Sequence, residues 1–331
     1  MRTLVLGGTH HVGRAVVEAA LDRGHDVVTL NRGTSGVATP GVDARVADRL
    51  ARDEVATALG DDTFDAVVDT WSWAPAAVRD SAALLSGRAG HYTYVSSRSV
   101  YTWPPVAGSD ESAPVVDGDA DSTDAVDYAA AKRGGELAAV AEFDGPVALL
   151  RAGLILGPYE IVGRLPFWLE RIARGGRVPA PGPSDRPLQL VDARDVADWV
   201  VDQRPVGTYN TVSRPGQTTI GELLSECVRV TGSDAELVWL SPEVVEASGV
   251  EPWTELPIWT PPTGDLAPLH DCDTSRALAA GLTCRPVADT VTATWGWLQR
   301  EGVRVTREDR PPTGMDVAAE QRLWRAAGLS D

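Results

Sequence analysis

Short apolar runs alternate along the first half of the chain with segments in which apolar residues recur every three or four positions. Two such runs, at residues 2–6 and 26–30, flank a helical pattern over residues 11–23, and Gly7 and Gly8 follow the first run. A strand, a glycine turn, a helix and a second strand within about 30 residues form a βαβ unit, whose strands are parallel.

The same alternation continues beyond this unit. Further apolar runs predict four strands, and helical patterns separate them. The strands are expected at 45–48, 65–69, 91–95 and 146–152, and the helices near 50–59, 75–86 and 125–142. Regular alternation of this kind predicts an α/β fold: a doubly wound parallel sheet (Rossmann) with helices on both faces.

The pattern changes after about residue 156, where proline-rich segments carry scattered tryptophans. A chain of 331 residues exceeds what one hydrophobic core usually supports. We therefore expect a dinucleotide-binding domain over residues 1–155, to which residues 186–215 return. A second, smaller α+β substrate-binding domain would comprise residues 156–185 and 216–331.

Acidic residues dominate the charge, and the formal net charge is −17. Phosphate backbones and anionic lipids would repel such a surface, so nucleic acid and membranes are poor partners. The acidic residues 108–124 read as an exposed loop, with a lid over the cleft as the alternative. Three cysteines and five histidines lack metal-ligand spacing, and no long apolar run is present. We expect a reduced, cytoplasmic protein that holds no metal.

The turn GGTHHVG (residues 7–13) predicts a nucleotide site. Gly7, Gly8 and Gly13 allow a tight turn and close packing where the first helix begins, and a helix N-terminus attracts phosphate. The same turn contributes Thr9, His10 and Val12. His10 stands where the middle glycine is usual, and it either faces a cofactor phosphate or packs at the helix start.

The residues that follow the second and third strands are expected to contact the adenosine half of a cofactor. Asn31 and Arg32 stand where NAD sites place a carboxylate, and Arg32 could pair with a 2′-phosphate, so NADP(H) is favoured over NAD(H). An ordinary surface arginine is the alternative. Asp48 could accept a hydrogen bond from the adenine amine, or it is simply an exposed turn residue.

Tyr128 and Lys132 lie four positions apart in a predicted helix, so both project from one face. A phenol with a pKa of about 10 needs a neighbouring cation to work at neutral pH. Lys132 is the one lysine among 29 arginines, which favours this function over an incidental exposed pair. Ser96 or Ser97, at the end of a strand, could hold a substrate oxygen.

In this order, GGTHHVG, VSSRSVY, YAAAK and LRAGLILGP resemble the short-chain dehydrogenase/reductase superfamily, in its extended and atypical branch with NAD-dependent epimerases and dehydratases. The resemblance covers about residues 1–215. It implies that Ser97 binds the substrate oxygen, that Tyr128 is the general acid/base and that Lys132 binds the nicotinamide ribose. Many relatives dimerise through helices that flank the tyrosine, so a homodimer is a modest expectation.

Two departures from that pattern limit the reaction. In sugar dehydratases of this branch two carboxylates follow the serine position, but this chain has Arg98 and Ser99. Nucleotide-sugar enzymes place an arginine where this chain has Leu188, and Arg186 is a substitute two residues away. Dehydration is not expected, and the nucleotide-sugar reading weakens.

Trp71, Trp73 and Trp103 follow strand ends and would give a small-molecule site apolar walls, unless they pack a hinge. Our first interpretation is an NADPH-dependent reductase or dehydrogenase that moves a hydride to or from a small, largely apolar carbonyl or alcohol of secondary metabolism. One alternative is an NAD(P)-dependent epimerase of a sugar or nucleotide-sugar. Another is a non-catalytic relative that senses dinucleotide or binds RNA.

Overall fold

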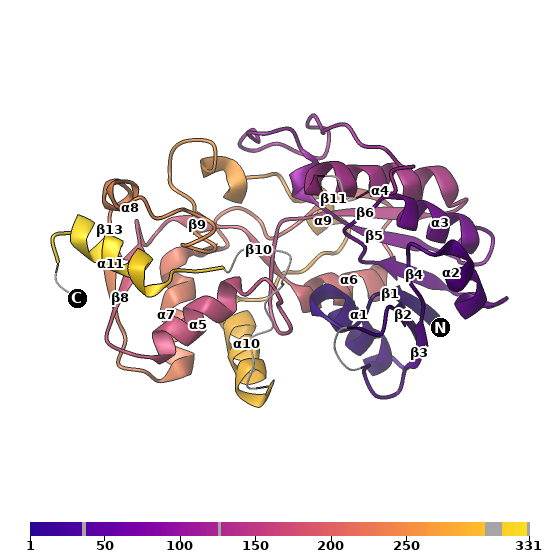
Figure 1. Ribbon diagram of the computed structural model, residues 1–331, viewed down its shortest axis with the longest axis horizontal. Coiled ribbons are helices and arrows are strands. Elements are labelled where there is room, and N and C mark those ends of the chain that lie inside the picture. Colours follow the sequence, from indigo (N-terminus) through magenta and orange to yellow (C-terminus); the bar gives the residue numbers. More distant parts are fainter. Residues whose placement is uncertain (35–37, 125–126, 302–312, 330–331) are drawn as a thin grey trace.

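A seven-stranded, entirely parallel sheet forms the larger part of the molecule (Figure 1). The structure is a computed structural model, which describes residues 1–34, 38–124, 127–301 and 313–329. The strand order is β11-β6-β5-β4-β1-β2-β3. These strands are β1 (Arg2–Leu6), β2 (Asp26–Asn31), β3 (Asp43–Val46), β4 (Ala66–Asp69), β5 (Tyr92–Ser97), β6 (Val147–Ala152) and β11 (Gly207–Thr211).

Helices cover both faces of this sheet, which confirms the predicted doubly wound fold. One face carries α2 (Arg52–Leu59), α3 (Ala76–Leu85) and α4 (Tyr128–Glu142), and the other carries α1 (His11–Asp22) and α6 (Ala193–Gln203). The apolar stripe of each helix packs on nearly continuous apolar strands, as expected for a parallel sheet buried on both sides.

The direction of winding reverses at β1. From β1 the chain proceeds to β2 and β3 on one side, and then to β4, β5 and β6 on the other. Connections that leave neighbouring strands in opposite directions open a crevice at the carboxyl ends, where α/β proteins bind ligands. The chain returns to this sheet after residue 186, because α6 covers it and β11 pairs with β6.

The remaining elements build a second hydrophobic core, in which Trp168, Trp259 and Trp297 are fully buried. Its short strands pair two by two: β7 with β10, β8 with β13 and β9 with β12. The strands are β7 (Leu154–Leu156), β8 (Arg177–Pro181), β9 (Pro187–Leu188), β10 (Leu190–Asp192), β12 (Thr218–Thr219) and β13 (Glu236–Leu240). The helices are α5 (Arg164–Ala173), α7 (Ile220–Thr231), α8 (Pro242–Ser248), α10 (Val287–Glu301) and α11 (Val317–Ala326).

Three short helices complete the described fold: η1 (Arg98–Val100), η2 (Ala267–His270) and α9 (Ser275–Ala279). Within the described ranges, no helix has the length and apolar character needed to cross a membrane.

The structure shifts several of the expected element boundaries, most of them by one or two residues, and two of the shifts have an evident cause. Helix α4 begins at Tyr128, because the Asp127 carboxylate accepts the N–H of Ala129 at 3.0 Å and caps it. The expected start near residue 125 falls beside residues 125–126, which lie outside the described part. Strand β3 ends at Val46, since Asp48 forms a turn by accepting the N–H of Leu50 at 3.0 Å.

The acidic segment 108–124 packs on its neighbours over much of its length. Val115 bridges to Tyr101 beside η1, and the Ser122 carbonyl accepts the N–H of Ala76 at 3.0 Å at the start of α3. The loop therefore lies along the sheet-bearing part of the molecule.

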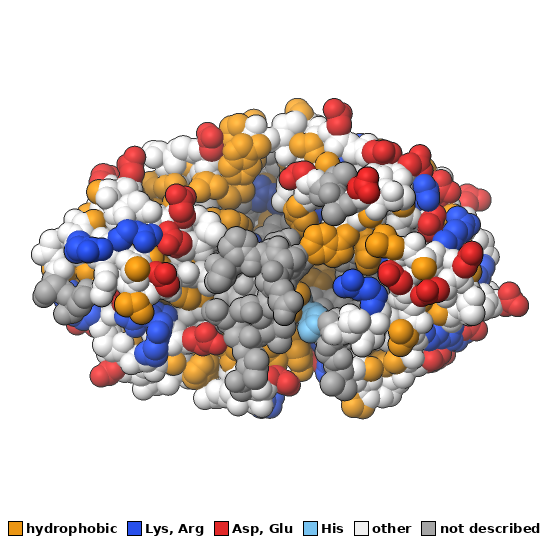
Figure 2. Space-filling view, viewed as in Figure 1, with side chains coloured by type: hydrophobic (Ala, Val, Ile, Leu, Met, Phe, Trp, Pro, Cys, Tyr) orange, Lys and Arg blue, Asp and Glu red, His pale blue; other side chains and the backbone are white. Residues whose placement is uncertain are grey.

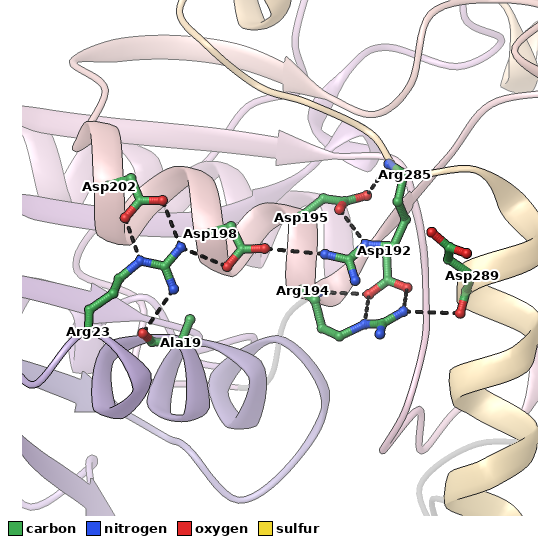
Figure 3. A network of polar contacts seen from close by, with 9 residues as sticks. All are labelled: Ala19, Arg23, Asp192, Arg194, Asp195, Asp198, Asp202, Arg285 and Asp289. Atoms are coloured by element: carbon green, nitrogen blue, oxygen red, sulfur yellow. Dashed lines mark hydrogen bonds and ion pairs between the residues drawn. The ribbon is translucent and has the colours of Figure 1, made fainter.

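A chain of ion pairs joins α1, α6 and the segment before α10 (Figure 3). Arg23, the C-cap residue of α1, binds Asp198 at 3.0 Å and also Asp202, both on α6. Arg285 binds Asp195 at 2.5 Å and Asp198 at 3.2 Å. The outer surface of α6 is thus tied at one end to α1 and at the other to the chain that leads into the second core.

Candidate active site

The glycine turn after β1 has no room for side chains. Gly7 has φ +126°, and a Cβ there would lie 2.4 Å from Thr70 Oγ1. Gly8 has φ +104°, and a Cβ at Gly13 would lie 2.7 Å from the Gly8 nitrogen. Bare backbone at the start of α1 is what a dinucleotide pyrophosphate needs for close approach, so these residues fit such a group.

Two adjacent histidines begin α1. Half-buried His10 is the N-cap residue but makes no capping bond, and burial together with Arg14 lowers its pKa. Its role toward a phosphate stays a prediction, as do those of half-buried Thr9 and buried Val12. The sequence analysis gave His11 no function. Its φ is +42°, its Nε2 atom is buried without a partner among the described residues, and burial lowers its pKa to about 4.

The residues assigned to the adenosine half lie at the ends of β2 and β3. Asn31 Oδ1 accepts the N–H of Gly33 at 2.9 Å and shapes the turn that presents Arg32, which is exposed. Asp48 is also exposed, and its carboxylate serves the turn before α2. Their contacts to a cofactor remain predictions.

The structure distinguishes the two candidate serines. Ser96 is buried, and its hydroxyl donates to Glu136 Oε1 at 2.8 Å, an oxygen that also accepts from Arg151 Nε at 2.9 Å. Ser97 is half-exposed at the carboxyl end of β5, and its Oγ accepts the N–H of Ser99 at 3.1 Å. Ser97 is therefore the serine that a substrate can reach.

Tyr128 and Lys132 lie one turn apart at the start of α4. Tyr128 is half-exposed, whereas Lys132 is 2% exposed. The Lys132 ammonium donates to the carbonyls of Trp71 and Val95, each at 2.6 Å, and lies 4.9 Å from the Tyr94 ring centre. Lys132 thereby joins the end of β4, strand β5 and the tyrosine helix at one place in the crevice.

The three tryptophans assigned to the substrate differ in their surroundings. Trp71 is half-buried, and its indole N–H donates to the Ala74 carbonyl at 2.9 Å. Trp73 and Trp103 are 38% and 56% exposed. Trp71 is thus held by a backbone contact, and Trp73 and Trp103 expose part of their indole surface after β4 and β5.

Arg186 donates to the Pro261 carbonyl in the loop before η2 at 3.1 Å, and to the Ala267 carbonyl at the start of η2 at 2.8 Å. Arg98 reaches the same region and donates to the Leu269 carbonyl at 2.8 Å. Both arginines hold η2 or the loop before it, and a substrate contact by Arg186 remains a prediction.

Arg49 and Asp69, which the sequence patterns did not single out, form a buried ion pair directly beneath Trp71. Asp69 ends an apolar strand as its one charged residue, and this was the available signal. The partner could not be deduced, because Arg49 lies 20 positions earlier on another strand end. In the described part of the chain, no group of three or more His, Cys, Asp or Glu side chains could hold a metal ion.

The model of the NAD-dependent epimerase/dehydratase family matches residues 3–202, which is more than half of the chain. The chain belongs to this family. It is thus an NAD(P)-dependent enzyme of the short-chain dehydrogenase/reductase type, as the motifs indicated. A search of curated proteins found no significant match.

Solved structures of epimerase/dehydratase enzymes share the fold at low sequence identity. The Bordetella bronchiseptica enzyme WbmH in complex with NAD⁺ is 19% identical, with a TM-score of 0.69 over 91% of this chain and 99% of that one. The UDP-glucose 4-epimerase of Thermotoga maritima is 17% identical, with a TM-score of 0.66 over 92% and 100%. The dTDP-glucose 4,6-dehydratase of Bacillus anthracis is 14% identical, with a TM-score of 0.65 over 91% and 97%.

Family membership favours the epimerase alternative over the reductase that the sequence analysis put first. Figure 2 shows acidic side chains gathered over the part of the molecule that contains the large sheet, and hydrophobic side chains nearer the middle of the same face.

Proposed function

We propose that the protein is an NAD(P)-dependent epimerase that acts on a secondary alcohol of a sugar or nucleotide-linked sugar. The observation that carries this proposal is that a member of this family has an accessible Ser97 at the end of β5, and Tyr128 and Lys132 one turn apart on α4. No carboxylate occupies the two positions after the serine. Relatives named as UDP-glucose 4-epimerases support the substrate class.

The side chains divide the proton chemistry among them. Tyr128 accepts the proton of the substrate hydroxyl and later returns it, and the Lys132 ammonium lies one helical turn away on α4. Ser97 donates a hydrogen bond to the same substrate oxygen and orients it. When bound, the nicotinamide supplies a reversible hydride acceptor. Returning hydrogen to the opposite face of the carbon inverts it with no net oxidation.

The residues that follow Ser97 do not fit dehydration, the second activity in the family name. Elimination of water needs a general acid and a general base beside the oxidised carbon. Arg98 and Ser99 occupy the two positions after Ser97, and Arg98 donates to the Leu269 carbonyl. An arginine, which stays protonated, cannot serve as either group. Epimerisation needs no such pair.

The glycine turn, Asn31, Arg32, Asp48 and Lys132 would hold the cofactor. The exposed Arg32 and the absence of a carboxylate at Asn31 favour NADP(H), whereas the family name and the NAD-bound relatives favour NAD(H). We propose that both are bound, with NADP(H) the tighter.

The proposal is tested with the purified protein and a panel of UDP- and dTDP-linked hexoses, monitored by proton NMR. We expect nucleotide to remain bound through purification and epimers to interconvert without net NAD(P)H production. Tyr128→Phe should abolish interconversion and retain the nucleotide. The control Tyr209→Phe alters a phenol that donates to Val206 beside β11 and should remain active. No interconversion of any sugar would overturn the proposal.

A second candidate is an NADPH-dependent reductase of a small carbonyl compound, favoured by exposed Arg32, Trp73 and Trp103. It predicts stoichiometric loss of added NADPH with an aldehyde or ketone and no retained nucleotide. The same preparation therefore separates the two functions.

A further inference from the structure

The position of the Lys132 ammonium depends on a segment outside the sheet. One of its carbonyl acceptors belongs to Val95, which β5 fixes through the sheet. Another belongs to Trp71, which lies two residues after the end of β4 and has no strand partner. A turn of this kind needs side-chain contacts to hold its carbonyl in place.

Asp69 and Arg49 supply these contacts. Asp69 Oδ1 accepts the backbone N–H of Trp71 at 2.9 Å, and the Arg49 guanidinium lies 5.2 Å from the centre of the Trp71 ring. The Trp71 backbone and indole are thus held from below by one charged pair, while its carbonyl accepts from Lys132 and from Tyr94, the latter at 3.2 Å.

The pair itself is fully ordered by its surroundings. Arg49 and Asp69 join through two hydrogen bonds of 3.0 and 2.8 Å, and their side chains are 3% and 0% exposed. The Tyr92 hydroxyl donates to Asp69 Oδ2 at 2.6 Å, and Arg49 also donates to the Ala77 carbonyl at 3.1 Å. Removing two charges from water is costly, so apolar residues would stabilise this place at least as well.

We propose that Arg49 and Asp69 are positioning residues that act on Lys132 through the Trp71 turn. The proposal rests on the function proposed above for Lys132, because only a reacting tyrosine and a bound ribose require the ammonium at a defined point. The pair fixes the turn, the turn fixes the Trp71 carbonyl, and the carbonyl fixes the ammonium.

The solitary lysine permits a direct test without substrate. Protein grown with ¹³C,¹⁵N-lysine gives one lysine side-chain signal, from Lys132, whose titration NMR can follow wherever circular dichroism shows an intact fold. Arg49→Met and Asp69→Asn each disturb the turn. Loss of a carbonyl acceptor removes a bond that favours the ammonium, so both variants should lower the Lys132 titration midpoint by about one pH unit.

The opposite charges of the two residues make the test selective. If the pair affected Lys132 through its charges alone, removing the arginine would raise the midpoint and removing the aspartate would lower it. Shifts in opposite directions, or no shift in either variant, would overturn the proposal. Arg171→Met is the matched control, because it breaks a partly buried pair with Glu320 in the second core and should leave the signal unchanged.

A milder variant guards against loss of the fold. Tyr92→Phe removes only the 2.6 Å bond to Asp69, and a smaller downward shift is expected. If neither charge variant folds, an unchanged midpoint in Tyr92→Phe overturns the proposal. Epimerisation assays distinguish the failure of this proposal from the failure of the proposed function. If the wild-type protein is inactive but the variants still shift the Lys132 titration midpoint, the epimerase function is rejected and the positioning role is retained. In an active enzyme both charge variants should lower kcat more than they change KM.

Discussion

Gly135 of α4 lies directly against the phenol ring of Tyr94, and a Cβ at this position would lie 2.3 Å from the Tyr94 hydroxyl oxygen. The missing side chain lets β5 and α4 approach closely, with the Tyr94 ring beneath the Lys132 ammonium. Glycine in the middle of a helix is less stable than alanine, and the close contact between α4 and the Tyr94 ring offsets this cost.

We therefore expect Gly135→Ala to destabilise the protein by about 1–3 kcal/mol, because overpacking against a buried ring outweighs the better helix propensity of alanine. Urea unfolding measures this change. Gly296→Ala is the control, since among the described residues a Cβ at that site in α10 would meet only Arg300 Nη1, at 3.4 Å. It should stabilise the protein by about 0.5–1 kcal/mol. Equal effects of the two variants would contradict the tight contact.

The adjacent serines should respond in opposite ways to alanine substitution. Ser97→Ala removes the proposed hydrogen bond to substrate oxygen, so kcat/KM should fall about 10- to 100-fold while stability changes little. Ser96→Ala removes a donor to buried Glu136 and should cost about 1–3 kcal/mol of unfolding free energy. Steady-state kinetics and thermal unfolding of both variants test whether Ser97 serves the substrate and Ser96 serves stability. A loss of stability in Ser97→Ala alone would contradict this assignment.

Cofactor choice is expected to depend on Arg32. Loss of a charge-assisted bond to the 2′-phosphate should weaken NADPH binding about 10- to 100-fold in Arg32→Ala and leave NADH binding unchanged. Fluorescence titration of nucleotide-free protein provides the measurement. Arg229→Ala alters an arginine that is equally exposed to solvent on α7 and should change neither affinity. A parallel loss of both nucleotides would show that Arg32 does not discriminate between them.

Buried His270 should make stability fall in mild acid. Its Nδ1 accepts the N–H of Gln189 at 3.1 Å, and the opposite nitrogen donates to the Ile258 carbonyl at 2.8 Å. Burial, assisted by Arg186 and Arg98 and opposed by those backbone bonds, lowers its pKa from 6.5 to about 4. A lowered folded-state pKa stabilises the protein above pH 6.5, and this contribution disappears as the pH falls toward 4.

For His270 alone the loss is about 2 kcal/mol at about pH 5. Urea unfolding at about pH 7.5 and pH 5 measures it, and His270→Asn should show a smaller difference between the two conditions. His11 has a similarly lowered pKa and contributes in the same direction. An unchanged pH dependence in the variant would contradict the assignment.

Local patterns sufficed to predict the sheet, the glycine turn and the serine that ends β5, because each depends on residues close in sequence. The start of α4 was misplaced by three residues, since Asp127 determines it by capping rather than by periodicity. The partnership of Arg49 with Asp69 depends on how three strand ends meet, and no spacing encodes that.

The ion pairs between the aspartates of α6 and arginines of other segments affect the thermal unfolding of the molecule. Arg23 attaches α6 to α1, and Arg285 attaches it to the chain entering α10. Helix α6 packs in the core of the large sheet, and its ion pairs connect that core with the chain leading into the second core. Unfolding of either part of the molecule would break these ion pairs and leave the partner charges in the other part unpaired. Heating should therefore produce one calorimetric transition, in which both halves of the molecule are lost together.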